Sequence, residues 1–516
     1  MNKEQKKFYK VVILDTVIFY PEHEKLLKQL VEKPKIERVP LEYNQTSKEW
    51  ELPDGYLMPE DASIIIWPSS LPESFNGISV EVHEKLKTGY CYVEQGLRDN
   101  IPAQNLLNRV KDADCIITCW TAIPDEVLER INPKAILTWT HEYEHRLNVK
   151  LANKKGIFTA CVNDYGTGAV AELEINMLLE LIKRNKKTDL KFENEHDIAI
   201  GVLMELFCHY RKSYVNEKNT RRGKFSHQFH KMGRSLKYYG DLNGKDLDEV
   251  IPYKSIEGKR IGFVTKSKQV DYLVNVLRNG FNATVSILEN LDTNNADFYK
   301  IISLNDFVVY DSSEIDQLAV AKIIMIGRDR SIDIQSLKHY DEILKNKTVG
   351  IVGLGRIGSR VAKLACSFGM NVIYSGNKKE ELKYQHVELD QLLKNSDIIS
   401  VNIKAHVENN LISKEKFDLI KKDAYFINTS DANAVDQASL TKRMLANDLY
   451  VGLDVYQGLP TTKTLLLDDD LNGKIKDQLA NHVITYRAGW ATQESIKVKT
   501  YKLLGHMITV LSKMEP

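Results

Sequence analysis

The sequence lacks several features that mark whole classes of protein. No stretch of its 516 residues approaches the roughly 20 consecutive apolar residues that a membrane-spanning helix needs. Charge of one sign is also missing, since 71 Lys and Arg residues stand against 70 Asp and Glu residues. A chain with such balanced charge has no broad positive electrostatic field that would attract nucleic acid or an anionic membrane, and we expect neither as a partner. Because the charged start MNKEQKKFYK leads directly into a strand, we expect a cytoplasmic location.

Cysteine is sparse, with six residues in the whole chain and no C-x-x-C pair. Cys115 and Cys119 flank an apolar strand, DCIITCW, in a pattern typical of buried core. The spacing therefore predicts neither a disulfide framework nor a metal site.

The most informative stretch that is present is KTVGIVGLGRIG at residues 347–358. An apolar strand there runs into Gly353, Gly355 and Gly358 and then into a helical pattern. The first glycine permits a tight turn, the second lets backbone N–H groups approach a pyrophosphate, and the third lets the helix pack on the strand. This spacing predicts a dinucleotide-phosphate site.

Strands and helices alternate along the rest of the chain, which predicts an α/β fold. The first unit opens with the strand VVILD at 11–15, and residues 44–80 carry one isolated apolar run, SIIIWP, which indicates an inserted strand with long loops. After the Gly156 turn, a long amphipathic helix is expected to cross between domains.

A second α/β unit is predicted over residues 256–330, because GKRIGFV at 258–264 mirrors NKTVGIV at 346–352. The copy has TKSKQV where the other version has its glycines, so it lacks a phosphate loop. Two interpretations stay open: a structural unit, and a regulatory or partner-binding module.

Several motifs follow one another in a familiar order: DYGTGAVAELE, VGIVGLGRIGSRVAKL, SDIISVNI, AYFINTS, VDQASL and GLDVYQGLP. In this order the chain resembles the D-isomer-specific 2-hydroxyacid dehydrogenases over roughly residues 10–225 and 346–510. The resemblance implies two doubly wound, Rossmann-like domains and a homodimer acting on a small-molecule substrate. The implied division is a flavodoxin-like substrate-binding domain at 1–195 completed by 485–516, an inserted linker helix and extra α/β unit at 196–345, and an NAD(P)-binding domain at 346–484.

The resemblance also assigns cofactor contacts beyond the three glycines. Arg356 and Ile357 occupy phosphate-contacting places, Thr429 lies in the ribose-facing turn, and Asp454 matches a residue near the carboxamide. NAD-dependent relatives carry an acid at the end of the second strand, where this chain has Ser375, Asn377 and Lys378. Since no carboxylate there repels a 2′-phosphate, NADP is favoured over NAD, although Lys378 and Lys379 also fit the start of a solvated helix.

The reactive positions of the family hold other residues here. Arg487 stands where the family has its proton-exchanging histidine, Asp431 where it has the carboxylate-binding arginine, and Leu459 where it has the orienting acid. Asp431 and Arg487 can face each other across the cleft, either as an inert salt bridge or as part of a remodelled pocket in which Arg487 binds an anionic group. His482 is expected to cap a loop upstream of a strand.

Replacement acid/base groups are predicted in the loop THEYEHRLN, where His141 and His145 accompany Glu142 and Glu144. A polar surface loop is the other interpretation. The sequence thus leaves open a divergent NAD(P)-dependent oxidoreductase acting on a hydroxy or keto group, and a catalytically inactive cofactor-binding pseudoenzyme that serves as scaffold or sensor. A third possibility is an enzyme that uses bound nicotinamide without net redox change.

Overall fold

The computed structural model of the chain describes residues 9–14, 21–31, 35–39, 42–44, 46, 49–67, 103–119, 121–140, 146–184, 254–264, 271–289, 307–310, 344–378, 383–404, 410–455, 481–485 and 489–513. Three parallel sheets with flanking helices make up most of this part of the chain, so the predicted α/β class is confirmed. Within the same residues, no helix is both long and apolar enough to cross a membrane.

The first unit is built on a parallel sheet in the order β2-β5-β1-β6-β7-β8. Its strands are β1 (Val11–Ile13), β2 (Ile36–Arg38), β5 (Ile64–Ile66), β6 (Cys115–Thr118), β7 (Ala135–Thr138) and β8 (Phe158–Cys161), and a small hairpin adds β3 (Glu42–Asn44) and β4 (Glu49–Glu51). Its helices are α1 (Pro21–Leu27), α4 (Ala103–Val110), α5 (Asp125–Leu128) and α6 (Val149–Lys154). The central strands β1, β6 and β7 are buried at every position, as expected for parallel strands covered on both faces.

The predicted strand in SIIIWP is confirmed as β5, and its place in the sheet explains its apolar sequence. It pairs with β1 on one side and β2 on the other, in register Val11 to Ile64 and Ile36 to Ile64. Ile64 and Ile65 point to opposite faces of the sheet and are both buried, so both faces of the strand are covered and successive positions are apolar. The segment is therefore an integral strand of the sheet, not an appendage.

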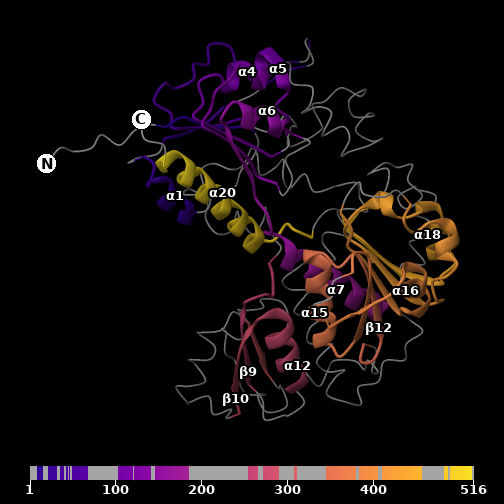
Figure 1. Cartoon of the computed structure of the whole chain (residues 1–516). Helices are drawn as coiled ribbons and strands as arrows, with labels where there is room; N and C mark the ends of the chain where they lie inside the picture. The colour runs from indigo at the N-terminus through magenta and orange to yellow at the C-terminus, as the bar shows by residue number, and fades with distance from the viewer. Residues whose placement is uncertain are drawn as a thin grey trace.

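The last helix, α20 (Gln493–Lys513), returns to this first unit and lies beside α1 (Figure 1). The hydroxyl of Tyr9, just before β1, donates a hydrogen bond of 2.8 Å to the carbonyl of Leu511. The two ends of the described chain thus pack on the same sheet.

The second unit holds a parallel sheet in the order β14-β13-β12-β15-β16-β17-β18. Its strands are β12 (Thr348–Val352), β13 (Asn371–Ser375), β14 (Gln385–His386), β15 (Ile398–Val401), β16 (Ala424–Asn428), β17 (Leu449–Leu453) and β18 (His482–Ile484). Its helices are α15 (Arg356–Ser367), α16 (Leu389–Asn395), α17 (Lys414–Phe417) and α18 (Gln437–Leu445), with the short 3-10 turn η6 (Ala432–Ala434). The strand order reverses at β12, between β13 and β15, which is where a doubly wound sheet opens a crevice for a dinucleotide.

The long helix α7 (Thr167–Arg184) packs on this second sheet, against β16, β17, β18 and α15. Its N-terminal end lies by the segment that leads into α20, because a Cβ at Gly166 would lie 3.0 Å from that of Trp490. Figure 1 shows α7 beside α15, away from the first sheet. Although its face toward the core is mostly apolar, it also buries Glu172, Glu174 and Asn176, and buried polar groups of this kind need partners.

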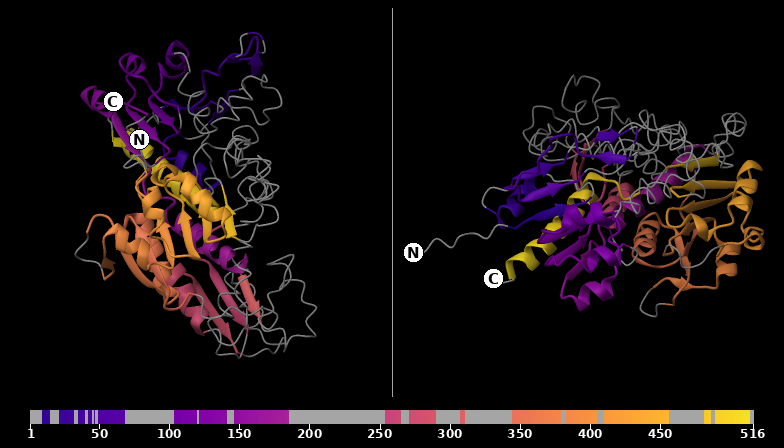
Figure 2. Two further views of the ribbon diagram at one scale, coloured as in Figure 1. Left: turned by 90° about the vertical axis from the view of Figure 1, so that its right-hand side faces the viewer. Right: turned by 90° about the horizontal axis from the view of Figure 1, so that it is seen from above.

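The described residues of the inserted stretch form a small α/β unit. It consists of β9 (Arg260–Val264), α12 (Asp271–Asn275), the π-helical turn η4 (Val276–Gly280), β10 (Thr284–Leu288) and β11 (Phe307–Tyr310). The three strands form a parallel sheet in the order β10-β9-β11. Figure 2 shows this inserted unit extending from the second unit at the end remote from α4, α5 and α6. Residues 265–270, which replace the phosphate loop in the copy, lie outside the described residues.

The inserted unit shares one hydrophobic core with α7 and the second sheet. Its turn η4 packs against α15, where Phe281 and Phe368 meet edge to face at 6.4 Å between ring centroids. Gly280 allows a close approach at this contact, since a Cβ there would lie 2.4 Å from the Ser367 hydroxyl.

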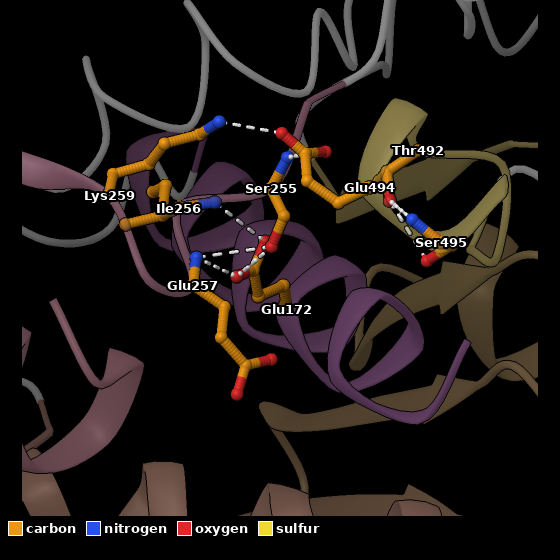
Figure 3. Close-up of polar contacts among 8 residues, drawn as sticks. All are labelled: Glu172, Ser255, Ile256, Glu257, Lys259, Thr492, Glu494 and Ser495. Atoms are coloured by element: carbon orange, nitrogen blue, oxygen red, sulfur yellow. Dashed lines mark hydrogen bonds and ion pairs between the residues drawn. The ribbon is translucent and has the colours of Figure 1, made fainter. Parts of the chain in front are cut away.

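A cluster of polar contacts joins the same unit to α7 and α20 (Figure 3). The buried carboxylate of Glu172 accepts hydrogen bonds from the Ser255 hydroxyl at 2.6 Å, the Ile256 amide at 3.1 Å and the Glu257 amide at 2.7 Å. At the start of α20, Glu494 accepts from the Ser255 amide at 2.9 Å and pairs with Lys259 at 2.6 Å. The turn that precedes β9 is thus held by two other helices.

Candidate nucleotide-binding site

The predicted phosphate loop lies between β12 and α15 and has the geometry that its glycines require. Gly353 has a φ of +93°, and a Cβ there would lie 2.6 Å from the carbonyl oxygen of Asn402. At Gly358 a Cβ would lie 2.2 Å from the carbonyl oxygen of Gly353. Both positions therefore exclude any side chain.

Gly355 differs from the other two because a Cβ built on it meets nothing within 4 Å. It is exposed and caps the N-terminus of α15, whose first turn contains no acidic residue. The first amides of a helix carry partial positive charge and lack partners within the helix. The open space at Gly355 is thus a cradle that fits a pyrophosphate. Arg356 is exposed beside it, and Ile357 is half-buried.

The end of β13, where the ribose of the adenosine end would lie, carries small and basic groups. Ser375 is half-buried, Asn377 and Lys378 are exposed, and the Ser375 carbonyl accepts from the Gly353 amide at 2.9 Å. Sequence reasoning missed His386, on the adjacent strand β14, whose Nε2 lies 2.9 Å from the carbonyl of Gly376. Between residues 371 and 378 no carboxylate is present.

On the other side of the switch point, which is the place at β12 where the strand order reverses, Thr429 and Asp454 follow the neighbouring strands β16 and β17. The structure brings them to the same edge of the sheet, because the carboxyl ends of parallel strands meet there. Asp454 is buried and accepts from the Thr485 hydroxyl at 2.6 Å and the Gly489 amide at 3.1 Å. Thr429 is half-buried, with its hydroxyl on a carboxylate of α7.

That carboxylate belongs to Glu174, which sequence reasoning did not select. Its oxygens accept from the Thr429 hydroxyl at 2.7 Å and from the Ser400 hydroxyl on β15. Burial raises the pKa of Glu174 to about 7, and the charge of Asp454 acts in the same direction, while the hydrogen bonds from Ser400, Thr429 and Asn402 oppose the rise. The group is thus poised between its charged and neutral forms at neutral pH.

Asn402 connects this carboxylate to the phosphate loop. Its side-chain amide donates to the Ser400 hydroxyl at 2.5 Å, and its backbone carbonyl lies against Gly353. The residue is 9% exposed, yet its Oδ1 has no hydrogen-bond partner among the described residues. A buried acceptor without a partner is costly, and a bound ligand with N–H or O–H groups would satisfy it.

The predicted catalytic residues are only partly placed. His141, His145 and Arg487 lie outside the described residues, and so does the predicted pairing of Asp431 with Arg487. Asp431 is buried and caps η6, where its carboxylate accepts from the Asn433 amide at 3.0 Å. His482 does not lie in a loop upstream of a strand. It is the first residue of β18 and is buried, because this strand continues the sheet beyond β17.

A buried lysine, Lys499, lies on α20 at the carboxyl ends of the first sheet. Its ammonium nitrogen is 3.9, 4.6 and 4.4 Å from the ring centroids of Trp139, Tyr165 and Trp490. Trp490 follows Gly489, the donor to Asp454, so this aromatic cage adjoins the nucleotide site. Sequence reasoning missed both Lys499 and Glu174, because the sequence does not show which charged residues of a helix are buried.

Comparison with known proteins agrees with this site. Residues 325–472 match the family described as D-isomer specific 2-hydroxyacid dehydrogenase, NAD binding domain. A protein of Staphylococcus aureus (strain USA300), provisionally named a 2-hydroxyacid dehydrogenase, is 38% identical over 159 residues. That stretch is 30% of this chain and 47% of the relative, so the chain matches about half the length of the curated relatives.

The chain is also similar to solved structures at low sequence identity. The D-lactate dehydrogenase from Aquifex aeolicus, complexed with NAD and lactic acid, is 17% identical with a TM-score of 0.44, and covers 97% of this chain and 96% of that chain. An acyclic imino acid reductase in complex with NADPH and D-arginine is 17% identical with a TM-score of 0.46. The match covers 98% of this chain and 97% of that chain. Over its nucleotide-binding part, the chain is therefore similar to the NAD binding domain of the D-isomer specific 2-hydroxyacid dehydrogenases.

Proposed function

We propose that this protein is an NAD(P)-dependent oxidoreductase that acts on a hydroxy or keto group of a small molecule through a remodelled active site. The open cradle at Gly355, between two glycines that exclude side chains, carries the proposal. A loop that had lost its ligand would be free to accumulate side chains there, since nothing occupies the space. When bound, the nicotinamide supplies or accepts the hydride.

Each part of the site has a role in this proposal. The amides at the start of α15, with Arg356, would hold the pyrophosphate. Ser375, Asn377 and Lys378 would receive the ribose of the adenosine end, and the lack of a carboxylate there supports NADP over NAD. Thr429 and Asp454 would border the nicotinamide end. Catalytic roles for His141, His145 and Arg487, and assembly as a homodimer, remain part of the proposal.

A second candidate function is a cofactor-binding protein without turnover. One observation favours it: the carboxylate of Asp431, at the position where the family binds substrate through an arginine, is engaged in capping η6. A residue committed to backbone geometry is a poor substrate ligand. Cofactor binding without hydride transfer to any added carbonyl compound would select this candidate.

The first prediction concerns the cradle and uses fluorescence titration with NADPH and NADH. We expect wild type to bind NADPH more tightly than NADH, and Gly355→Asp to abolish binding of both, because a carboxylate would fill the anion site. The φ of −79° at Gly355 accommodates any residue, so the variant should fold.

The matched control is Gly505→Asp, on the exposed side of α20, where an added Cβ also meets nothing. It introduces the same charge far from the loop and should leave binding intact. If wild type bound neither nucleotide at millimolar concentration, or if Gly355→Asp bound them normally, the proposed function would be wrong.

A further inference from the structure

Two buried carboxyl groups lie on the side of the sheet that would receive the nicotinamide. Glu174 reaches the ends of β15 and β16 from α7, and Asp454 follows β17. The phosphate loop follows β12, and a dinucleotide placed across the switch point extends from there over β15 and β16. These carboxyl groups are therefore on the nicotinamide side and not on the adenosine side.

Two arginines, one on α15 and one on α7 itself, are directed away from Glu174. Arg360 of α15 pairs with Glu257 at 2.9 Å, and Arg184 bonds the carbonyl of His482 on β18 at 2.9 Å. Arg184 is ten residues beyond Glu174 along α7, roughly 15 Å at 1.5 Å per residue. From β15 and β16, hydroxyl and amide groups face Glu174, and from β17 the charge of Asp454 raises its pKa.

The Oδ1 of Asn402, which has no hydrogen-bond partner within the described part of the chain, indicates that this edge is built for a ligand. This atom is buried, and the side-chain amide of the same residue joins the hydrogen-bond network of Glu174 through Ser400. The backbone carbonyl of Asn402 lies beside Gly353. An acceptor at this place suits the carboxamide N–H or ribose O–H groups of a nicotinamide nucleotide.

We infer that Glu174 couples proton binding to the redox form of the cofactor that this site prefers. The oxidised nicotinamide ring carries a positive charge, and the reduced ring carries none. With Glu174 ionised, two carboxylates attract the oxidised ring in a site of low dielectric. With Glu174 protonated, the site attracts the oxidised ring less, and its relative affinity for the neutral reduced form increases. By linkage, the oxidised form releases a proton on binding and the reduced form takes one up. This inference rests on the proposed function.

The test compares the dissociation constants of NADP⁺ and NADPH, and of NAD⁺ and NADH, between pH 6 and pH 8.5. For wild type, we expect the ratio of the reduced to the oxidised constant to rise at least about fivefold with pH, the lower end of ordinary coupling between sites. In Glu174→Gln, which imitates the protonated form, the ratio should stay near the wild-type value at low pH. Glu180→Gln, on the same helix but beside Arg184, should behave as wild type.

A measurement on wild type alone covers the case in which Glu174→Gln fails to fold. Calorimetric titration near pH 7, in two buffers of different ionisation enthalpy, should show more proton uptake with NADPH than with NADP⁺. Equal proton uptake, or a ratio that changes with pH as strongly in Glu174→Gln as in wild type, would overturn the inference alone. No binding of any nucleotide would overturn the proposed function as well.

Discussion

At the scale of single residues, Lys499 is the least expected feature of the first unit. Its side chain is 1% exposed, and burial lowers its pKa to about 8, with the Cys119 thiol acting in the opposite direction. The three aromatic rings offset part of the cost of burying an ammonium group, since a desolvated cation–π contact contributes about 2 kcal/mol. The remaining cost must be carried by the rest of the fold.

A substitution at this lysine should therefore stabilise the protein. A lysine whose pKa is lowered on folding contributes full stability above its unfolded pKa of 10.5, and that stability is lost as pH falls toward 8. At pH 7 we expect Lys499→Met to raise the free energy of unfolding by about 2 kcal/mol, because methionine fills the aromatic cage without a charge.

Urea denaturation at pH 7 and at pH 10.5 measures this effect. The increase in the free energy of unfolding on Lys499→Met should be largest at pH 7. It should be nearly absent at pH 10.5, where the lysine of the unfolded chain is half neutral. A loss of stability at pH 7 would show that the cage favours the cation more than burial disfavours it.

At the scale of elements, α7 and the turn before β9 depend on each other. Glu172 is fully buried, and its carboxylate satisfies two amides and one hydroxyl of the inserted unit. Glu494 makes a comparable set of contacts at the partly exposed edge of the same joint. The contacts of the two acids therefore differ in value according to how much water reaches them.

Removal of the buried acid should be the more damaging change. We expect Glu172→Ala to lower the free energy of unfolding by about 3 kcal/mol, because it leaves buried donors without acceptors. Glu494→Ala should cost less than about 1 kcal/mol. Amide hydrogen exchange at Ile256 gives a local readout: fast exchange is expected only in Glu172→Ala. Similar losses in both variants would contradict this ranking.

Elements whose signals are local were predictable from the sequence. The phosphate loop is specified within twelve letters by its glycines, and β9 could be found because it echoes β12. Glu174 could not be found in this way, since its partners Ser400 and Thr429 lie 226 and 255 residues away along the chain. The position of β5 inside the first sheet was missed for the same reason. Strand order depends on pairing that no local pattern reports.

At the scale of the whole molecule, the ionisation of Glu174 should appear in overall stability. An acid whose pKa is raised on folding contributes stability that is present at low pH and is lost as pH rises. The loss should extend from 4.5, its ordinary pKa, to about 7. The shift corresponds to about 3 kcal/mol, at 1.36 kcal/mol per pH unit.

We therefore expect Glu174→Gln to be less stable than, or equal to, wild type at pH 4.5 and more stable at pH 7.5. The measurement is the free energy of unfolding in urea across this pH range, with Glu180→Gln as the control. Parallel curves for wild type and Glu174→Gln would show that Glu174 ionises at its ordinary pKa in the folded protein.

The packing of η4 on α15 joins two helical segments that follow corresponding strands of the two related units. Between separate molecules, a contact of this size would form only at sufficient concentration and would be lost on dilution. Here both sides belong to one chain, so the effective concentration of each for the other is fixed by the connecting residues. The outer face of α15 is consequently covered at every protein concentration, and the helix that would carry the phosphates at its N-terminus has a permanent neighbour.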